Sequence, residues 1–172
     1  MFPSSPPTIG TKIKLSRNHM SHDAKIDELG LELPPPPQAL GLYKPVIQTS
    51  NHLYLSGHGP LQQDGSLVTG RLGDDMDVDQ GYAAARLVGL AILSSLRGHL
   101  GSLDRVNRLI KLTGFVKCTD SFEAQPAVIN GCSELMRDVF GADAGVGARS
   151  AVGTNALPAG MAVEIEAVFE IK

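Results

Sequence analysis

The last eleven residues of the chain, AVEIEAVFEIK, alternate between apolar and mostly acidic side chains. Successive side chains of a β-strand point to opposite faces of its sheet, so this segment predicts a strand with one apolar face. The apolar face comprises Val163, Ile165, Ala167, Phe169 and Ile171. The other face carries Glu164, Glu166, Val168 and Glu170, as expected where a sheet is covered on one side only.

Short extended runs earlier in the chain could pair with this strand. Residues 46–49 and 52–56 are joined by Ser50-Asn51, which predicts a tight hairpin. Asp64-Gly65 predicts a second turn, before another extended run at residues 67–71.

Two helices are expected in the middle of the chain. Residues 78–100 carry apolar side chains at helical spacing, with Asp77 as N-cap and Gly101 as the terminating residue. A second helical region is expected from Asp120 or Ser121 to Phe140, with Pro126 near its beginning.

Residues 105–117 lie between these helices and predict a long strand with a bulge near Gly114. The resulting order is two or three strands, helix, strand, helix and two strands. This order predicts an α+β domain in which two helices pack on one face of a mixed, mostly antiparallel sheet.

The first 41 residues have a different character. Residues 1–22 are rich in Pro and Ser, contain no acid and are expected to be disordered. They could be a mitochondrial presequence, an extension that precedes a functional start at Met20, or a plain tail. Residues 23–31 predict a short helix, and four prolines at 34–37 predict a stiff extended connector. We therefore expect residues 1–41 to be a disordered or extended segment and residues 42–172 to form the domain.

Charge and composition exclude several classes of function. The chain carries 15 basic and 18 acidic residues, and the first 22 residues hold three of the bases and none of the acids. Residues 23–172 therefore have a net charge of −6, which disfavours binding to a phosphate backbone. Only 5% of residues are aromatic, which argues against a base-stacking surface. The longest apolar run, residues 87–96, is too short to span a membrane, and no membrane partner is expected.

Cys118 and Cys132 are the only cysteines, and they match no zinc-binding spacing. We expect two reduced structural thiols and no metal, which suits an intracellular protein.

Arg149 and Glu164 are candidates for a binding site. Small residues precede Arg149 and offer it no local carboxylate, and a guanidinium group can bind a carboxylate with two hydrogen bonds. The alternative for Arg149 is an ordinary salt bridge. Glu164 is the acid nearest the Leu157–Gly160 turn, although three acids on one strand face usually contact solvent.

Tyr43 and the Ser56-Gly57-His58-Gly59 segment are further candidates. Glycines directly after a strand allow the backbone to approach a ligand closely, and they also form turns. No sequence neighbour of His58 could act with it as a nucleophile or an orienting acid, so the residues alone assign it no catalytic role.

Four features together resemble the RidA/YjgF/UK114 family. They are Tyr43 thirteen residues before Ser56-Gly57, the helix motif YAAARL, the strand LDRVNRLIKLTGFV, and ARSAV followed by LPAGMAVEIEAVFEI. The resemblance covers about residues 42–172. Asn130-Gly131 and the leading LGLYKPV are similar to the subgroup described as endoribonuclease L-PSP/chorismate mutase-like.

The resemblance implies a chorismate mutase-like fold and a homotrimer with three clefts between subunits. It also implies cytoplasmic hydrolysis of reactive 2-imino or 2-enamino acids to 2-keto acids and ammonia, without cofactor or metal. If residues 1–22 are a presequence, the compartment would be mitochondrial instead.

The family's residue roles can be carried over to matching positions. Arg149 would hold the substrate carboxylate, Glu164 would position the attacking water, and Tyr43 would complete the catalytic set. Ser56 and Gly57 would contact the substrate, together with His58, which stands where the family has a glutamine. Lys44-Pro45 replaces Ser-Gln beside Tyr43, a change that puts the substrate range in question.

Two other functions remain open at this point. The chain could form a non-catalytic trimer that binds small carboxylates or regulates a partner. It could also be an endoribonuclease, although its net negative charge disfavours this.

Overall fold

The computed structural model describes residues 21–39 and 41–172. The expectations for residues 1–20, including a presequence and a start at Met20, lie outside this part of the chain. Five strands form one sheet in the order β1-β2-β5-β3-β4. They are β1 (Val46–Thr49), β2 (His52–His58), β3 (Val106–Lys117), β4 (Ala148–Thr154) and β5 (Val163–Ile171). Every pairing is antiparallel except that of β3 with β4, so the predicted α+β class is confirmed.

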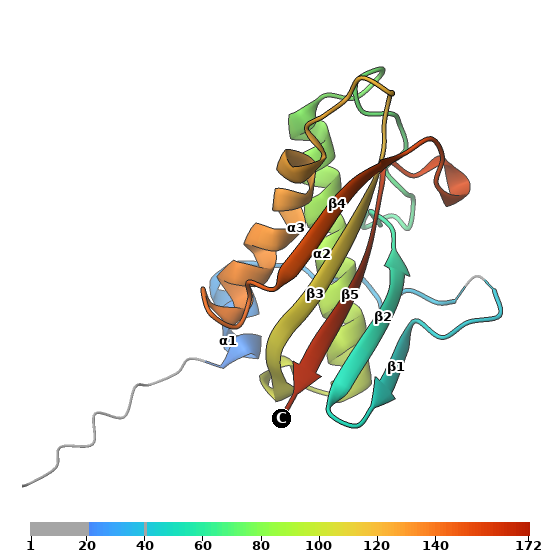
Figure 1. The fold of residues 1–172 in the computed structure, drawn as a ribbon. Helices are drawn as coiled ribbons and strands as arrows, with labels where there is room; N and C mark the ends of the chain where they lie inside the picture. The colour runs from blue at the N-terminus through green and yellow to red at the C-terminus, as the bar shows by residue number, and fades with distance from the viewer. Residues whose placement is uncertain (1–20, 40) are drawn as a thin grey trace, which may run out of the picture.

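Two long helices cover one face of this sheet, as Figure 1 shows. They are α2 (Val78–Leu100) and α3 (Gln125–Phe140). The alternation of β5 is also confirmed, because its five apolar residues are buried on the side of the helices. Glu164, Glu166 and Glu170 lie on the opposite face, which none of the described helices covers.

The ends of α2 follow the predicted capping residues. The Asp77 carboxylate accepts a hydrogen bond from the Gln80 amide, and the Gln80 side chain accepts one from the Asp77 amide. Gly101 ends the helix with φ of 81°, a left-handed conformation that favours glycine.

Two details differ from the prediction. Helix α3 begins at Gln125 rather than at 120 or 121, because Pro126 is tolerated in the first turn of a helix and not in its interior. The bulges of β3 lie at Asn107 and Ile110, where its register with β5 shifts, and not near Gly114. A glycine is needed at position 114 for another reason, because a Cβ there would lie 2.4 Å from the Ile129 side chain of α3.

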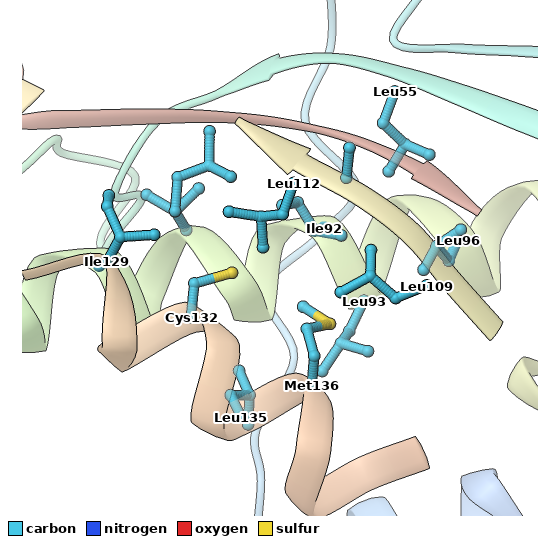
Figure 2. Packing of buried hydrophobic residues seen from close by; sticks show 14 of the residues in the cluster. Leu55, Ile92, Leu93, Leu96, Leu109, Leu112, Ile129, Cys132, Leu135 and Met136 are labelled. Carbon is cyan, nitrogen blue, oxygen red and sulfur yellow. The ribbon is translucent and has the colours of Figure 1, made fainter. Parts of the chain in front are cut away.

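The core lies between the two helices and the sheet, as Figure 2 shows. Leu93 and Leu96 of α2, Met136 of α3 and Leu112 of β3 are each at most 2% exposed. Cys118 and Cys132 are free thiols and both are buried. Burial raises the pKa of the Cys132 thiol to about 12, so this thiol is un-ionised near neutral pH.

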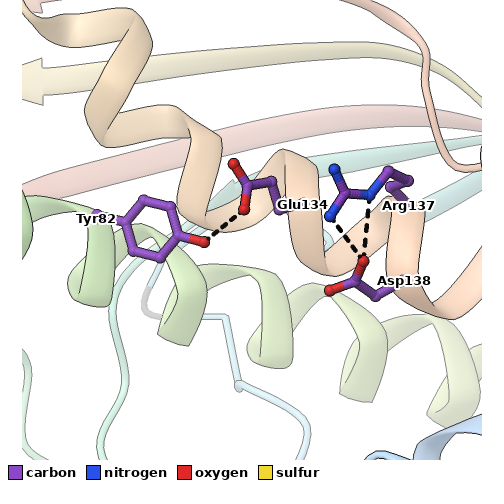
Figure 3. Close-up of polar contacts among 4 residues, drawn as sticks. All are labelled: Tyr82, Glu134, Arg137 and Asp138. Carbon is purple, nitrogen blue, oxygen red and sulfur yellow. Dashed lines mark hydrogen bonds and ion pairs between the residues drawn. The ribbon is translucent and has the colours of Figure 1, made fainter.

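The two helices approach each other closely at Gly131. A Cβ at this position would lie 2.0 Å from the backbone oxygen of Tyr82, so only glycine fits there. Figure 3 shows the polar contacts on the outer side of the helix pair, where the Tyr82 hydroxyl donates to Glu134 at 2.9 Å. The same figure shows Arg137 paired with its neighbour Asp138 on α3.

The segment before the sheet packs against the same core. The expected short helix is present as α1 (His22–Glu28), and its Ile26 is 2% exposed within the core cluster. After α1, residues 29–39 run along the helix layer, and we call them the N-terminal strap. The buried Ser94 hydroxyl donates to the Pro34 carbonyl, which ties the strap to α2.

The expected third extended run at residues 67–71 does not form a continuous strand. It makes isolated bridges through Leu67 to Leu61 and through Thr69 to Met161. The structure therefore places a loop, rather than a further strand, beside the end of β2.

Candidate functional site

A cleft of about 650 Å³ opens where β2 ends and β5 begins. Its walls come from the end of the strap, the approach to β1, the loop that follows β2, and the short 3₁₀ helix η2 (Pro158–Gly160) with Met161. It is lined by five of the six residues that the sequence assigned to a site, namely Tyr43, Ser56, Gly57, His58 and Glu164. The folded chain brings these five together although they span more than 120 positions of the sequence.

A β-bulge shapes the polar end of this cleft. The register between β2 and β5 shifts between Leu55 and His58, so Ser56 and Gly57 are displaced from regular pairing. The Glu164 side chain lies directly over Gly57, where a Cβ would come within 2.0 Å of Glu164 Oε1. Gly57 is therefore required by the position of this carboxylate.

The Glu164 carboxylate is partly buried and accepts no hydrogen bond from residues 21–39 or 41–172. Desolvation raises the pKa of this carboxyl, and the nearby charge of Glu166 raises it further. A carboxylate whose pKa is raised is a stronger proton acceptor than an ordinary carboxylate, as a general base requires.

His58 lies behind the bulge with only 3% of its surface exposed. Its Nδ1 is 2.6 Å from the Ser56 carbonyl, which can only accept, so Nδ1 carries the proton. Its Nε2 lies 2.8 Å from the Ser95 hydroxyl of α2 and accepts from it. Burial lowers the pKa of this imidazole, so the ring is neutral and holds the bulge in place.

Ser56 and Tyr43 also line the cleft. The Ser56 hydroxyl donates to the Lys44 carbonyl at 2.8 Å, which leaves its oxygen able to accept from a ligand. The Tyr43 side chain is 49% exposed. Both can therefore be reached from solvent.

Arg149 does not reach this cleft within one subunit. It pairs with Leu112 of β3, which pairs with Ala167 of β5, three residues from Glu164. Two strands across and three residues along correspond to about 14 Å between the Cα atoms of Arg149 and Glu164. The two side chains also point to opposite faces of the sheet, since Arg149 lies on the side of the helices.

The Arg149 guanidinium is held by α3. Its Nη1 donates to Asn130 Oδ1 at 2.7 Å and to Ser133 Oγ at 3.0 Å. The side chain is exposed, and its Nε and Nη2 donate to no group in the described part of the chain. An arginine held by one nitrogen in this way can offer the others to a carboxylate.

Sequence reasoning missed several residues of this arrangement. Ser95, Asn130 and Ser133 orient His58 and Arg149, and they lie on helices, where only the tertiary fold decides which residue meets which strand. Pro37 and Gln38 line the cleft although the proline run reads as a spacer. The signal that could have identified them is the end of the proline run only a few residues before Tyr43.

In residues 21–39 and 41–172, no three His, Cys, Asp or Glu side chains lie close enough together to hold a metal ion. No helix in the same part of the chain combines the length and apolar character needed to cross a bilayer.

Comparison with known proteins gives the family. The model of a family described as "YjgF/chorismate_mutase-like, putative endoribonuclease" matches residues 23–165. TCP17 from Trypanosoma cruzi is 40% identical over 148 residues, which are 86% of this chain and 92% of that protein.

Two solved structures are similar over most of the chain. Atu1372 from Agrobacterium tumefaciens, described as of unknown function, has a TM-score of 0.80 and 39% identity, over 88% of this chain and 94% of that one. A protein from Shewanella oneidensis described as a "putative endoribonuclease" has a TM-score of 0.84 and 31% identity, over 88% of this chain and all of that one. The chain therefore belongs to the RidA/YjgF family and has its chorismate mutase-like fold.

Proposed function

We propose that this protein is a homotrimeric hydrolase that converts reactive 2-imino and 2-enamino acids to 2-keto acids and ammonia in the cytoplasm. The observation that carries the proposal is the partly buried Glu164 carboxylate above the Gly57 bulge, in a cleft that Ser56 and Tyr43 also line. Membership of the RidA/YjgF family supports the same reaction.

The trimer explains how Arg149 could join the cleft. Within one subunit, Arg149 and Glu164 lie on opposite faces of the sheet. The sheet face without helices exposes large apolar side chains, with Ile47 49%, Tyr54 51% and Val152 43% exposed. An exposed apolar face of this kind is typical of a surface that binds another protein. In the proposed trimer, association buries this face and brings Arg149 of a neighbouring subunit to the polar end of the cleft.

The chemistry needs few groups, because the imine carbon is already electrophilic. Water adds to C2 while the electrons of the C=N bond move to nitrogen, which takes up a proton. Loss of ammonia from the resulting carbinolamine then forms the keto group. Glu164 would accept a proton from the attacking water and return it to the leaving nitrogen, a task that suits a carboxyl with a raised pKa.

Binding and orientation fall to the other residues. Arg149 would bind the substrate carboxylate with its free nitrogens, and Asn130 and Ser133 would fix the direction of the guanidinium. The Ser56 oxygen and the Tyr43 hydroxyl would hydrogen-bond the substrate. His58 would act as a positioning residue through the Ser56 carbonyl.

Removal of the Arg149 guanidinium tests these residue roles. Imines are generated in situ by an amino-acid oxidase, and the acceleration of their decay is measured. Arg149→Ala should lower kcat/KM at least about 100-fold, because an anchoring charge-assisted pair is lost. The oligomeric state, measured by sedimentation, should not change. Arg137→Ala, which removes an exposed arginine of α3, is the matched control and should retain full activity.

The alternative function is a trimer that binds small carboxylates without turnover. The replacement of Ser-Gln by Lys44-Pro45 beside Tyr43 favours it. Calorimetric binding of 2-keto acids without ammonia release would support this alternative over the deaminase. Cleavage of RNA that survives stringent purification and is lost in Glu164→Gln would instead indicate an endoribonuclease.

A further inference from the structure

The cleft is polar at one end and apolar at the other, and two glycines of the same strand end mark the two parts. The Glu164 carboxylate lies over Gly57. The side chains of Met161 and Leu67 lie over Gly59, where a Cβ would come within 2.9 Å of Met161 Sδ and 3.1 Å of a Leu67 methyl. Two residues of extended chain separate these parts by about 7 Å.

The apolar part is walled on several sides. Leu61 and Leu67 come from the loop after β2, and Pro158 and Met161 come from η2 and the residue that follows it. Pro37 of the N-terminal strap also lines the cleft. We call the part of the cleft lined by Leu61, Leu67, Pro158 and Met161 the apolar compartment.

The strap is held in this position by contacts with α2. Ser94 binds the Pro34 carbonyl, and Pro36 lies close to Gly98, where a Cβ would come within 3.1 Å of the proline ring. These contacts lead directly to Pro37 and Gln38 at the cleft. The wall is therefore part of the folded molecule.

Charge restricts what the apolar compartment can take. Among the described residues that line the cleft, Glu164 is the only one with a charged side chain, because the buried His58 is neutral. A charged ligand side chain would lose its hydration in the compartment without a partner, which is unfavourable. An apolar side chain would gain from leaving water.

The size of the cleft also favours a ligand with a bulky side chain. A cleft of about 650 Å³ lies within the range that holds drug-sized molecules, and a three-carbon imino acid would fill only a small part of it. With its reacting carbon at Glu164, a ligand needs a long side chain to reach Met161 and Leu67, about 7 Å away.

We propose that the cleft takes 2-imino and 2-keto acids with a bulky apolar side chain, branched or aromatic, which occupies the apolar compartment. This inference rests on the proposed function for the position of the reacting carbon. It goes beyond that function by naming the side chain that the ligand carries.

Binding of 2-keto acids tests the proposal without requiring turnover. Calorimetry on the full chain compares pyruvate, 4-methyl-2-oxopentanoate, phenylpyruvate and 2-oxoglutarate. The branched and aromatic acids should bind at least about tenfold more tightly than pyruvate, since filling an apolar pocket by a few carbon atoms has effects of this size. Binding of pyruvate or 2-oxoglutarate as tight as that of the bulky acids, or no binding of any of the four, would overturn the proposal.

Two variants test whether the preference for bulky side chains arises in the apolar compartment. Leu67→Gln is similar in size and makes the wall polar, so the preference for phenylpyruvate over pyruvate should fall at least about fivefold. Leu29→Gln, at an exposed leucine just after α1 and outside the cleft, should leave the preference unchanged. An unchanged preference in a folded Leu67→Gln protein would contradict the assignment of the compartment.

The outcomes separate this inference from the proposed function. Equal kcat/KM for imines derived from alanine, leucine and phenylalanine would support the deaminase function and contradict the preference for bulky side chains. Tighter binding of the bulky keto acids without hydrolysis of any imine would contradict the deaminase function and support the proposed class of ligand.

Discussion

Glu164 shows how one residue can be unfavourable for folding and useful for function. Its carboxylate is partly buried, lies near Glu166 and has no hydrogen-bond donor in the described part of the chain. Glu170 of the same strand differs, because it accepts hydrogen bonds from Asn51 and Asn107. The alternating pattern of the sequence treats these acids alike, and only their surroundings separate them.

Replacing Glu164 with glutamine should stabilise the protein at neutral pH and abolish turnover. The folded-state pKa is raised, so the unfolded chain releases this proton first, and stability falls as pH rises through the folded-state pKa. Thermal melts should show a higher Tm for Glu164→Gln than for wild type at pH 8, with a difference that shrinks towards pH 4. Glu123→Gln, at an exposed residue before α3, is the control and should show no such trend. A lower Tm for Glu164→Gln at pH 8 would contradict this account.

His58 predicts a pH dependence of the opposite sense. Its pKa is lowered by burial, so the unfolded chain takes up a proton near the ordinary value of 6.5 while the folded protein resists protonation. The stability that depends on neutral His58 is present above this pH and is lost as pH falls below it. His58→Gln can still donate to Ser56 and accept from Ser95, and its unfolding free energy should fall less between pH 7 and pH 5. Exposed His99→Gln should behave like wild type in the same denaturant titrations.

At the scale of elements, local signals predicted those boundaries that depend on local chemistry. The capping residues Asp77 and Gly101 define α2 because they satisfy backbone groups within a few residues. The sequence predicts a start of α3 at Asp120 or Ser121, but the helix begins at Gln125, which places Pro126 in its first turn. A glycine within a strand often marks a bulge, so the sequence predicts one near Gly114, whereas this glycine makes room for Ile129 across the helix–sheet interface.

The contact between α2 and α3 gives a prediction at this scale. Gly131→Ala should destabilise the protein by about 3 kcal/mol, because its Cβ would overlap the Tyr82 carbonyl and force the helices apart. Gly98→Ala is the matched control within a helix. It gains about 1 kcal/mol of helix propensity against mild crowding of Pro36, so its unfolding free energy should lie within about 1 kcal/mol of wild type. Equal effects of the two substitutions in urea titrations would argue against a special role for the helix contact.

At the scale of the whole molecule, the proposed site needs more than one copy of the chain. Tyr43, Ser56 and Glu164 line one cleft, and Arg149 lies near the opposite edge of the same sheet. A closed symmetric ring would repeat the same junction at every interface. Each cleft would then take its arginine from one subunit and its carboxylate from the next.

Mixing two inactive variants tests this arrangement. Arg149→Ala and Glu164→Gln chains, co-expressed in equal amounts, would form mixed trimers. About one quarter of the clefts would then combine an intact Arg149 with an intact Glu164 from different subunits, so about a quarter of wild-type activity should return. A site built within one subunit would also be repeated in every copy, but it would regain nothing on mixing, because each chain lacks one of the two groups.

The sequence alone determined the class of fold, the one-sided sheet, the ends of α2 and the set of residues from which a site could be built. These properties follow from side-chain period, capping and turn chemistry, which act over a few residues. The tertiary structure decided that Glu164 lies over Gly57 and that His58 is buried and neutral. It also decided that the proline run ends at the cleft, and that Arg149 and Glu164 lie on opposite faces of the sheet. These depend on which residues meet across strands and helices far apart in the chain, where packing and desolvation set position and charge.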